Sequence, residues 1–209
     1  MRKAFTIAHG FLLILLVGLV PATARAELRL NEFLAGPARD WDGSGGLSTR
    51  DDEWVEVWND GAALLELSGY FITDGDTLPR FGFSGTLGPQ GRVLVFGSQA
   101  VDWERANGFP VFGLSLGNTG DRVMLWHAAA GDTTLVDQYV YLAHEAAADR
   151  AVGRGTDGGA WTLFDALNPY AGSVPPLGSG CAPSPGAPNQ CGPTPALRTS
   201  WGSLKALYR

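Results

Sequence analysis

Cysteine and histidine are scarce in this chain, which has two cysteines and three histidines among 209 residues. A structural zinc site takes four ligands, so Cys181 and Cys191 alone are too few to build one. Two of the histidines, His127 and His144, lie in the main body of the chain, and no third ligand follows either at a zinc-like spacing. We therefore expect both to be surface or hydrogen-bonded side chains.

Apolar runs are short as well. Phe11–Val20 is apolar over ten residues, whereas a membrane-spanning helix needs ~20. The run follows two basic residues and precedes an A-x-A pattern at residues 24–26, which is the order found in a secretory signal peptide. The alternative, a retained anchor helix, needs a longer run. We predict that residues 1–26 are a signal peptide, and that the mature chain starts near Glu27, has no transmembrane segment, and is secreted or held at the cell surface.

Basic residues are outnumbered in the predicted mature chain. Residues 1–26 remove three of the 15 Lys and Arg and none of the 21 Asp and Glu, so 12 basic residues face 21 acidic ones and the net charge is −9. An acidic surface repels phosphate backbones, which makes nucleic acid an unfavourable partner. The same surface attracts divalent cations. The remaining length is enough for one domain and a tail.

Segments with helical periodicity are rare after Glu27. Short strands rich in β-branched and aromatic residues recur every eight to twelve residues, separated by turn residues. Residues 28–34 and 53–58 are examples, and residues 92–96, apolar in both alternations, are typical of a central strand. Residues 100–106 fit one or two helical turns. No helix is long enough for a crossover between parallel strands, so we predict an all-β, antiparallel β-sandwich.

Proline, glycine and serine dominate from Pro169 onward. In an exported protein, Cys181 and Cys191, ten residues apart, are expected to form one disulfide, the alternative being two inert thiols. We place the domain at residues 27–191. Residues 192–209 form a Pro-containing linker and a short basic and aromatic tail. This tail is either an ordinary chain end or a recognition tag for export or envelope attachment.

Six stretches occur in an order that is found in one domain family: Leu30–Leu34, Asp52–Asn59, Leu67–Asp74, Leu116–Val123, Gly153–Trp161 and Ser184–Asn189. Together, over residues 28–189, they resemble the bacterial lamin tail domain, an immunoglobulin-like sandwich. This resemblance implies an exported, non-catalytic accessory role and implies no catalytic residues. The chain departs from the family pattern between Phe164 and Cys181, where an insertion precedes the final motif.

The loop before the second strand concentrates carboxylates and glycines. If Asp40 is position 1 of a calcium loop, Asp42 falls at position 3 and Asp51 at position 12. We predict a calcium site whose ligands are Asp40, Asp42, Ser44, Gly46, Asp51 and Asp52. Serine at position 5, a final aspartate in place of glutamate, and flanking strands indicate weak affinity, in the ~10⁻⁴–10⁻³ M range of extracellular modules. The alternative is a solvated acidic loop without an ion.

No catalytic centre is predicted. Residues 113–117 fit G-x-S-x-G, but a turn and another strand follow, whereas a nucleophile elbow needs a helix. We therefore predict a non-enzymatic binding or structural module whose partner is a protein or a cell-envelope component. The alternative is a carbohydrate-binding module that uses exposed aromatic residues, for example Trp54 and Trp58 on one strand face, to bind a polysaccharide.

Overall fold

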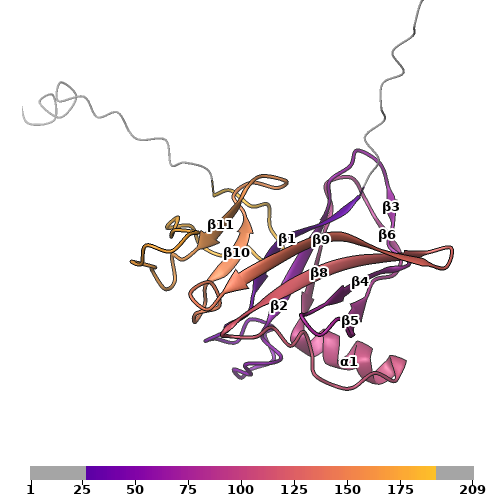
Figure 1. The fold of residues 1–209 in the computed structure, drawn as a ribbon, viewed down its shortest axis with the longest axis horizontal. Helices are drawn as coiled ribbons and strands as arrows, with labels where there is room; N and C mark the ends of the chain where they lie inside the picture. Colours follow the sequence, from indigo (N-terminus) through magenta and orange to yellow (C-terminus); the bar gives the residue numbers. More distant parts are fainter. Residues whose placement is uncertain (1–26, 192–209) are drawn as a thin grey trace, which may run out of the picture.

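The computed structural model describes residues 27–191, which form two antiparallel sheets packed face to face (Figure 1). The five-stranded sheet has the order β11 (Trp161–Phe164), β10 (Ala151–Arg154), β1 (Leu28–Leu34), β2 (Trp54–Asn59) and β7 (Arg92–Phe96). The four-stranded sheet has the order β5 (Pro79–Gly82), β4 (Tyr70–Thr73), β8 (Gly120–Ala129) and β9 (Asp132–Leu142). The predicted all-β sandwich is confirmed.

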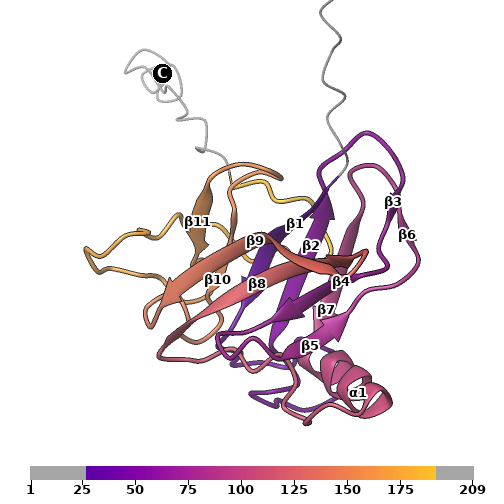
Figure 2. The same cartoon turned by 45° about the vertical axis from the view of Figure 1, so that its right-hand side comes forward.

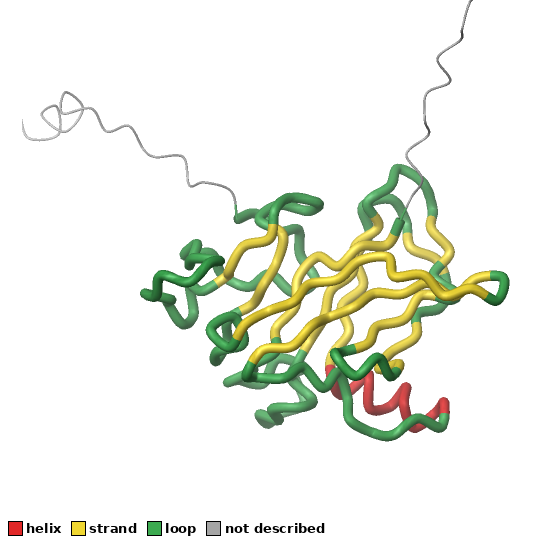
Figure 3. The backbone as a smooth tube through the Cα atoms, in the orientation of Figure 1, coloured by secondary structure: helices red, strands yellow, loops and turns green. Residues whose placement is uncertain are grey.

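Two smaller elements complete the fold. The short strands β3 (Leu65–Glu66) and β6 (Thr86–Leu87) pair as a separate ribbon. The helix α1 (Gly97–Asn107) contains the predicted turns at residues 100–106, packs against β5, and ends at Gly108 in the left-handed conformation that glycine tolerates best. Figure 3 shows this helix at the edge of the strands, with long loops at both ends of the sandwich. Within residues 27–191, no helix is long and apolar enough to cross a membrane.

The main core lies between the two sheets and depends on an irregularity in β1. The register of β1 against β2 shifts between Leu30 and Glu32, so Asn31 is an extra residue. Such a bulge changes which alternate residues face one side of the sheet. As a result Leu30 and Phe33, three residues apart, both join the core, where the Phe33 ring lies 5.1 Å from the ring of Tyr141 on β9.

The prediction that residues 92–96 form a central strand was wrong, because β7 is at the edge of its sheet (Figure 2). Its apolar pattern has another cause. Val95 faces the main core, whereas Leu94 and Phe96 pack against a second cluster on the opposite face of the same sheet, made of Leu34, Trp54, Ala151 and Phe164. Both faces of the edge strand are therefore covered.

The end of the domain, residues 181–191, is named here the closing segment. The disulfide between Cys181 and Cys191 is present, as predicted, and both cysteines pack against the second cluster. Two buried glutamates on neighbouring strands hold the segment. The Ser184 hydroxyl donates to Glu32 on β1 at 2.7 Å, and the Gly186 N–H donates to Glu56 on β2 at 2.7 Å.

Burial makes Glu32 an unusual acid. Its side chain is 1% exposed, and burial raises its pKa to about 8 against the opposing effect of its hydrogen bonds from Ser184. The negative field of Glu56, its direct cross-strand neighbour, adds to the increase. The closing segment is therefore attached at neutral pH to a glutamate that largely keeps its proton.

The pH dependence of stability should reveal Glu32. Between its ordinary pKa of 4.5 and about 8, the folded chain keeps a proton that the unfolded chain has lost. Stability therefore falls as the pH rises through this window, by at most about 1.4 kcal/mol per pH unit for one proton. We expect Glu32→Gln to remove this part of the slope in urea titrations across the window. Glu66→Gln, on the exposed side of the β3–β6 ribbon, is the control, and an unchanged slope in Glu32→Gln would contradict the expectation.

Candidate functional site

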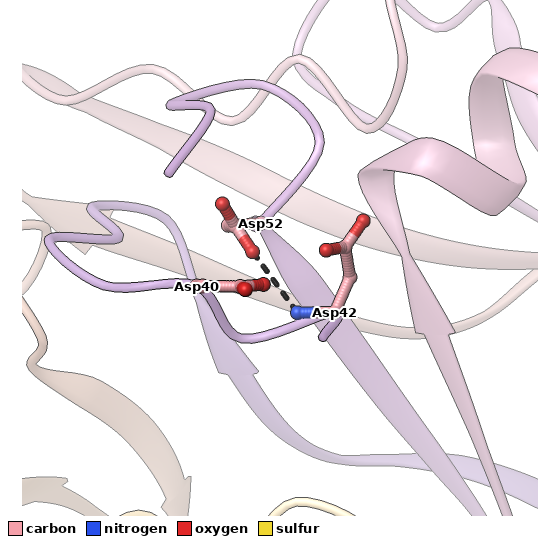
Figure 4. A group of neighbouring side chains, drawn as sticks. All are labelled: Asp40, Asp42 and Asp52. Carbon is pink, nitrogen blue, oxygen red and sulfur yellow. Dashed lines mark hydrogen bonds between the residues drawn. The ribbon is translucent and has the colours of Figure 1, made fainter. Parts of the chain in front are cut away.

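The loop between β1 and β2 brings three aspartates together. One carboxylate oxygen each from Asp40, Asp42 and Asp52 lies within 4.8 Å of the others. Figure 4 shows that Asp40 and Asp42 come from the first arm of the loop and Asp52 from the second, immediately before β2. These three residues are named here the aspartate cluster. Among residues 27–191 it is the one group of at least three potential metal ligands that converges this closely.

Asp52 organises the loop around itself. Its side chain is fully buried, and its Oδ1 accepts the backbone N–H groups of Trp41 at 2.6 Å and Asp42 at 2.9 Å. Its Oδ2 accepts the N–H of Ser48 at 2.7 Å. These bonds join the two arms of the loop, and because they are charge-assisted each is stronger than a neutral hydrogen bond.

Asp40 and Asp42 lie nearer to solvent and face a tight turn. The two oxygens of Asp40 accept the N–H groups of Ser44 at 3.0 Å and Gly45 at 2.8 Å, and Asp42 also accepts from Ser44 at 2.9 Å. Gly43 and Gly45 have φ angles of 73° and 98°, a region that L-residues with a Cβ rarely adopt. The glycines thus direct backbone N–H groups toward the carboxylates.

Of the other three predicted ligands, Asp51 lies outside the cluster. Asp51 points instead to Arg50, whose Nε lies 2.6 Å from its Oδ1, and this hydrogen bond lowers the pKa of Asp51. The Ser44 hydroxyl donates to the Gly46 carbonyl at 3.4 Å. Three of the six predicted residues therefore converge, Ser44 donates to two of them through its N–H group, and Asp51 pairs with a neighbouring cation.

The start of α1 lies beside the cluster. The N–H of Gly97 donates to the Glu53 carbonyl at 2.8 Å, and that of Ser98 donates to the Asp51 carbonyl at 3.1 Å. Burial acts to raise the pKa of Asp42, but hydrogen bonds from Ser44 and from the Ser98 side chain outweigh it and lower the pKa. The positive end of the helix also favours negative charge nearby. Asp42 is therefore ionised at neutral pH.

The chemistry of the cluster is that of a hard-cation site. The side-chain atoms that could bind a metal here are all carboxylate oxygens, the ligands that Ca²⁺ and Mg²⁺ prefer. Each oxygen that accepts one N–H keeps a further lone pair for a metal ion. Calcium takes six to eight oxygens in flexible geometry, so water and backbone carbonyls would complete its shell. Magnesium requires stricter octahedral geometry, which fits this hydrogen-bonded loop less well.

Other sequence candidates lie apart from one another. Ser115 of the G-x-S-x-G pattern is in a loop that leads into β8, and its N–H hydrogen-bonds to Glu53. His127 stacks on Tyr70 and His144 on Tyr170, with ring centroids 4.2 and 4.5 Å apart. The expected row of exposed tryptophans on β2 is wrong, since Trp54 is 0% and Trp58 6% exposed. Both side chains lie beneath loops that cover this face of the sheet.

Two clefts were not predicted from the sequence, because residues far apart in the chain form them. One has a volume of about 630 Å³, and its charged lining residues are Asp74 and Asp76, between β4 and β5, and Asp121 and Arg122 on β8. Arg80 neutralises part of that charge, at 2.9 Å from Asp74 and 2.6 Å from Asp76. The other, of about 410 Å³, is lined by aromatic residues and glycines of β4, β5 and α1.

Comparison of the chain with family models, with curated proteins and with solved structures finds no match. The resemblance to the lamin tail domain therefore stays a prediction from the sequence motifs.

The hydrogen bonds of Asp52 predict a large difference between two neighbouring acids. In Asp52→Ala, three N–H groups of the loop lose their acceptor, and at about 1–3 kcal/mol for each group left buried we expect a loss of about 3 kcal/mol or more. Asp51→Ala removes a partly exposed ion pair and should cost about 1 kcal/mol or less. Urea unfolding of both variants in chelator measures the difference without any metal. Equal losses would show that the loop does not depend on Asp52.

Proposed function

We propose that this chain is an exported, non-catalytic binding or structural module of lamin-tail type, with one calcium ion in the loop before β2. The observation that carries the calcium proposal is the convergence of Asp40, Asp42 and Asp52 within 4.8 Å. Three carboxylates this close repel one another, and a divalent cation between them converts that repulsion into attraction. A loop held in this way keeps its shape at the end of the sandwich.

Export is supported by the disulfide, which persists in oxidising compartments. The predicted signal peptide and the C-terminal tail lie outside the described residues 27–191.

N-terminal sequencing of protein recovered outside the cytoplasm is expected to begin near Glu27. An intact Met1 in the exported form would contradict the cleavage, and removal of residues 199–209 without effect on secretion or surface retention would rule out the tail as a tag.

The partner that we propose is a protein or a cell-envelope component. The described domain carries nine basic and 21 acidic side chains, a net charge of −12, which favours cationic or neutral surfaces and disfavours nucleic acid. Binding without turnover needs a rigid framework, and the two sheets with loops attached by buried carboxylates provide one. The second candidate, a carbohydrate-binding module, is favoured by the aromatic cleft.

Calcium should stabilise the domain by an amount that depends on the ratio of the free calcium concentration to the dissociation constant. With free calcium at about ten times the dissociation constant, the gain is about 1.4 kcal/mol, or about 3–6 °C in Tm for a domain of this size. We expect this shift when thermal melts in calcium are compared with melts in chelator, and we expect Asp40→Asn and Asp42→Asn to abolish it.

Asp51→Asn is the matched control for that experiment, because Asp51 pairs with Arg50 outside the cluster. This variant should keep the calcium-dependent shift. Superimposable melting curves of the parent chain in calcium and in chelator, together with no heat on calorimetric titration, would overturn the ion site. The sandwich and its other contacts would be unaffected by that outcome.

A further inference from the structure

The aromatic cleft lies on the face of the four-stranded sheet that is turned away from the main core. Gly82 on β5 pairs with Phe71 on β4, and Phe71 pairs with Trp126 on β8, so the three form one row across the sheet. Their neighbours Ile72 and Leu125 are fully buried in the core. Because side chains alternate along a strand, the row faces outward.

The rings of Trp103, Phe109 and Phe71 line the cleft. Trp103 of α1 lies over Gly82, where a Cβ would come within 2.8 Å of its ring, and it stacks on Phe109 with centroids 5.2 Å apart and planes 16° apart. Phe71 lines the cleft from β4, and Trp126, which is not part of the lining, lies beside it with ring centroids 6.5 Å apart. Phe71, Trp103 and Phe109 are each half-buried, so part of each ring remains accessible.

The lining carries no charge. It consists of aromatic side chains, proline, alanine, glycines and Ser84, in a domain with nine basic and 21 acidic side chains. The cleft is also open to solvent rather than enclosed. A wholly apolar ligand gains affinity only from the apolar surface that it buries. An open cleft buries only one side of such a ligand, so the gain in affinity is small. A charged ligand finds no partner among the lining side chains.

We propose that this cleft binds a neutral oligosaccharide, with Trp103 and Phe71 as its principal contacts. A pyranose ring is amphipathic: its C–H faces pack on aromatic rings, while its hydroxyl groups stay in water at the open side or bond to Ser84 and to backbone groups. This matches an uncharged, open cleft whose accessible side chains are aromatic. The proposal rests on the binding-module role proposed above and names the class of ligand.

The test is calorimetric titration of the mature chain, residues 27–209, with neutral hexasaccharides of β-1,4-linked glucose, xylose and N-acetylglucosamine up to millimolar concentration. We expect saturable binding of at least one hexasaccharide. Phe71→Ala and Trp103→Ala should each weaken it by about tenfold or more, as loss of a stacked aromatic contact of about 1.4 kcal/mol implies. Phe112→Ala, which removes a half-exposed ring outside the cleft, should bind like the parent chain.

Trp103→Leu keeps an apolar side chain against β5 and removes only the ring, so a folded variant with weakened binding separates stacking from loss of structure. No binding by any of the three hexasaccharides would overturn the proposal, as would binding that survives in both alanine variants. The calcium melts are run on the same variants. A retained calcium shift without saccharide binding rejects the cleft alone, and saccharide binding without a calcium shift rejects the ion alone.

Discussion

The loops of this sandwich depend on carboxylates, which accept hydrogen bonds from the backbone N–H groups of the loops. Asp52 accepts three N–H groups of the loop before β2, Glu104 accepts those of Phe112 and Gly113, and Asp165 accepts those of Tyr170 and Gly180. Glu32 and Glu56 do the same for the closing segment. An unpaired N–H in a buried loop is costly, so much of the acidic composition serves the fold.

This use of carboxylates changes how an acid-rich loop should be interpreted. From the sequence, the aspartates before β2 suggest either open solvent or a cation. In the structure, backbone N–H groups also take part, because those of residues 41–48 balance some of the negative charge of the aspartates. These hydrogen bonds therefore fix part of the loop's shape, and the proposed ion would add charge neutralisation to this turn. Preformed geometry lowers the ordering cost of binding, while competition from N–H donors limits affinity.

Features that depend on residues close together in the sequence were predicted correctly. The alternation in residues 28–34, the Val and Trp content of β2, and the disulfide spacing all led to the correct elements. The spacing of Asp40 and Asp42 also placed them correctly beside Asp52, but it could not show that Asp51, one residue away, turns to Arg50. The burial of Trp54 depends on packing by Trp41, from the loop before β2, and by the cysteines of the closing segment, far along the chain. The position of β7 at a sheet edge depends on the order of the strands, which its own residues do not record. The aromatic cleft needs Gly82 beside Trp103, a tertiary contact that no local pattern records.

The two proposed sites share one element, the helix α1. Its first residues bond to the acidic loop, since Gly97 and Ser98 donate to the carbonyls of Glu53 and Asp51, and a Cβ at Gly97 would lie 1.8 Å from the Arg50 carbonyl oxygen. Trp103 lies less than two turns further along the same helix and forms a wall of the cleft. The proposed ion, by holding the loop, would also hold the start of the helix that positions this ring. Because coupling between two binding equilibria is reciprocal, whatever calcium contributes to saccharide affinity, the saccharide contributes equally to calcium affinity.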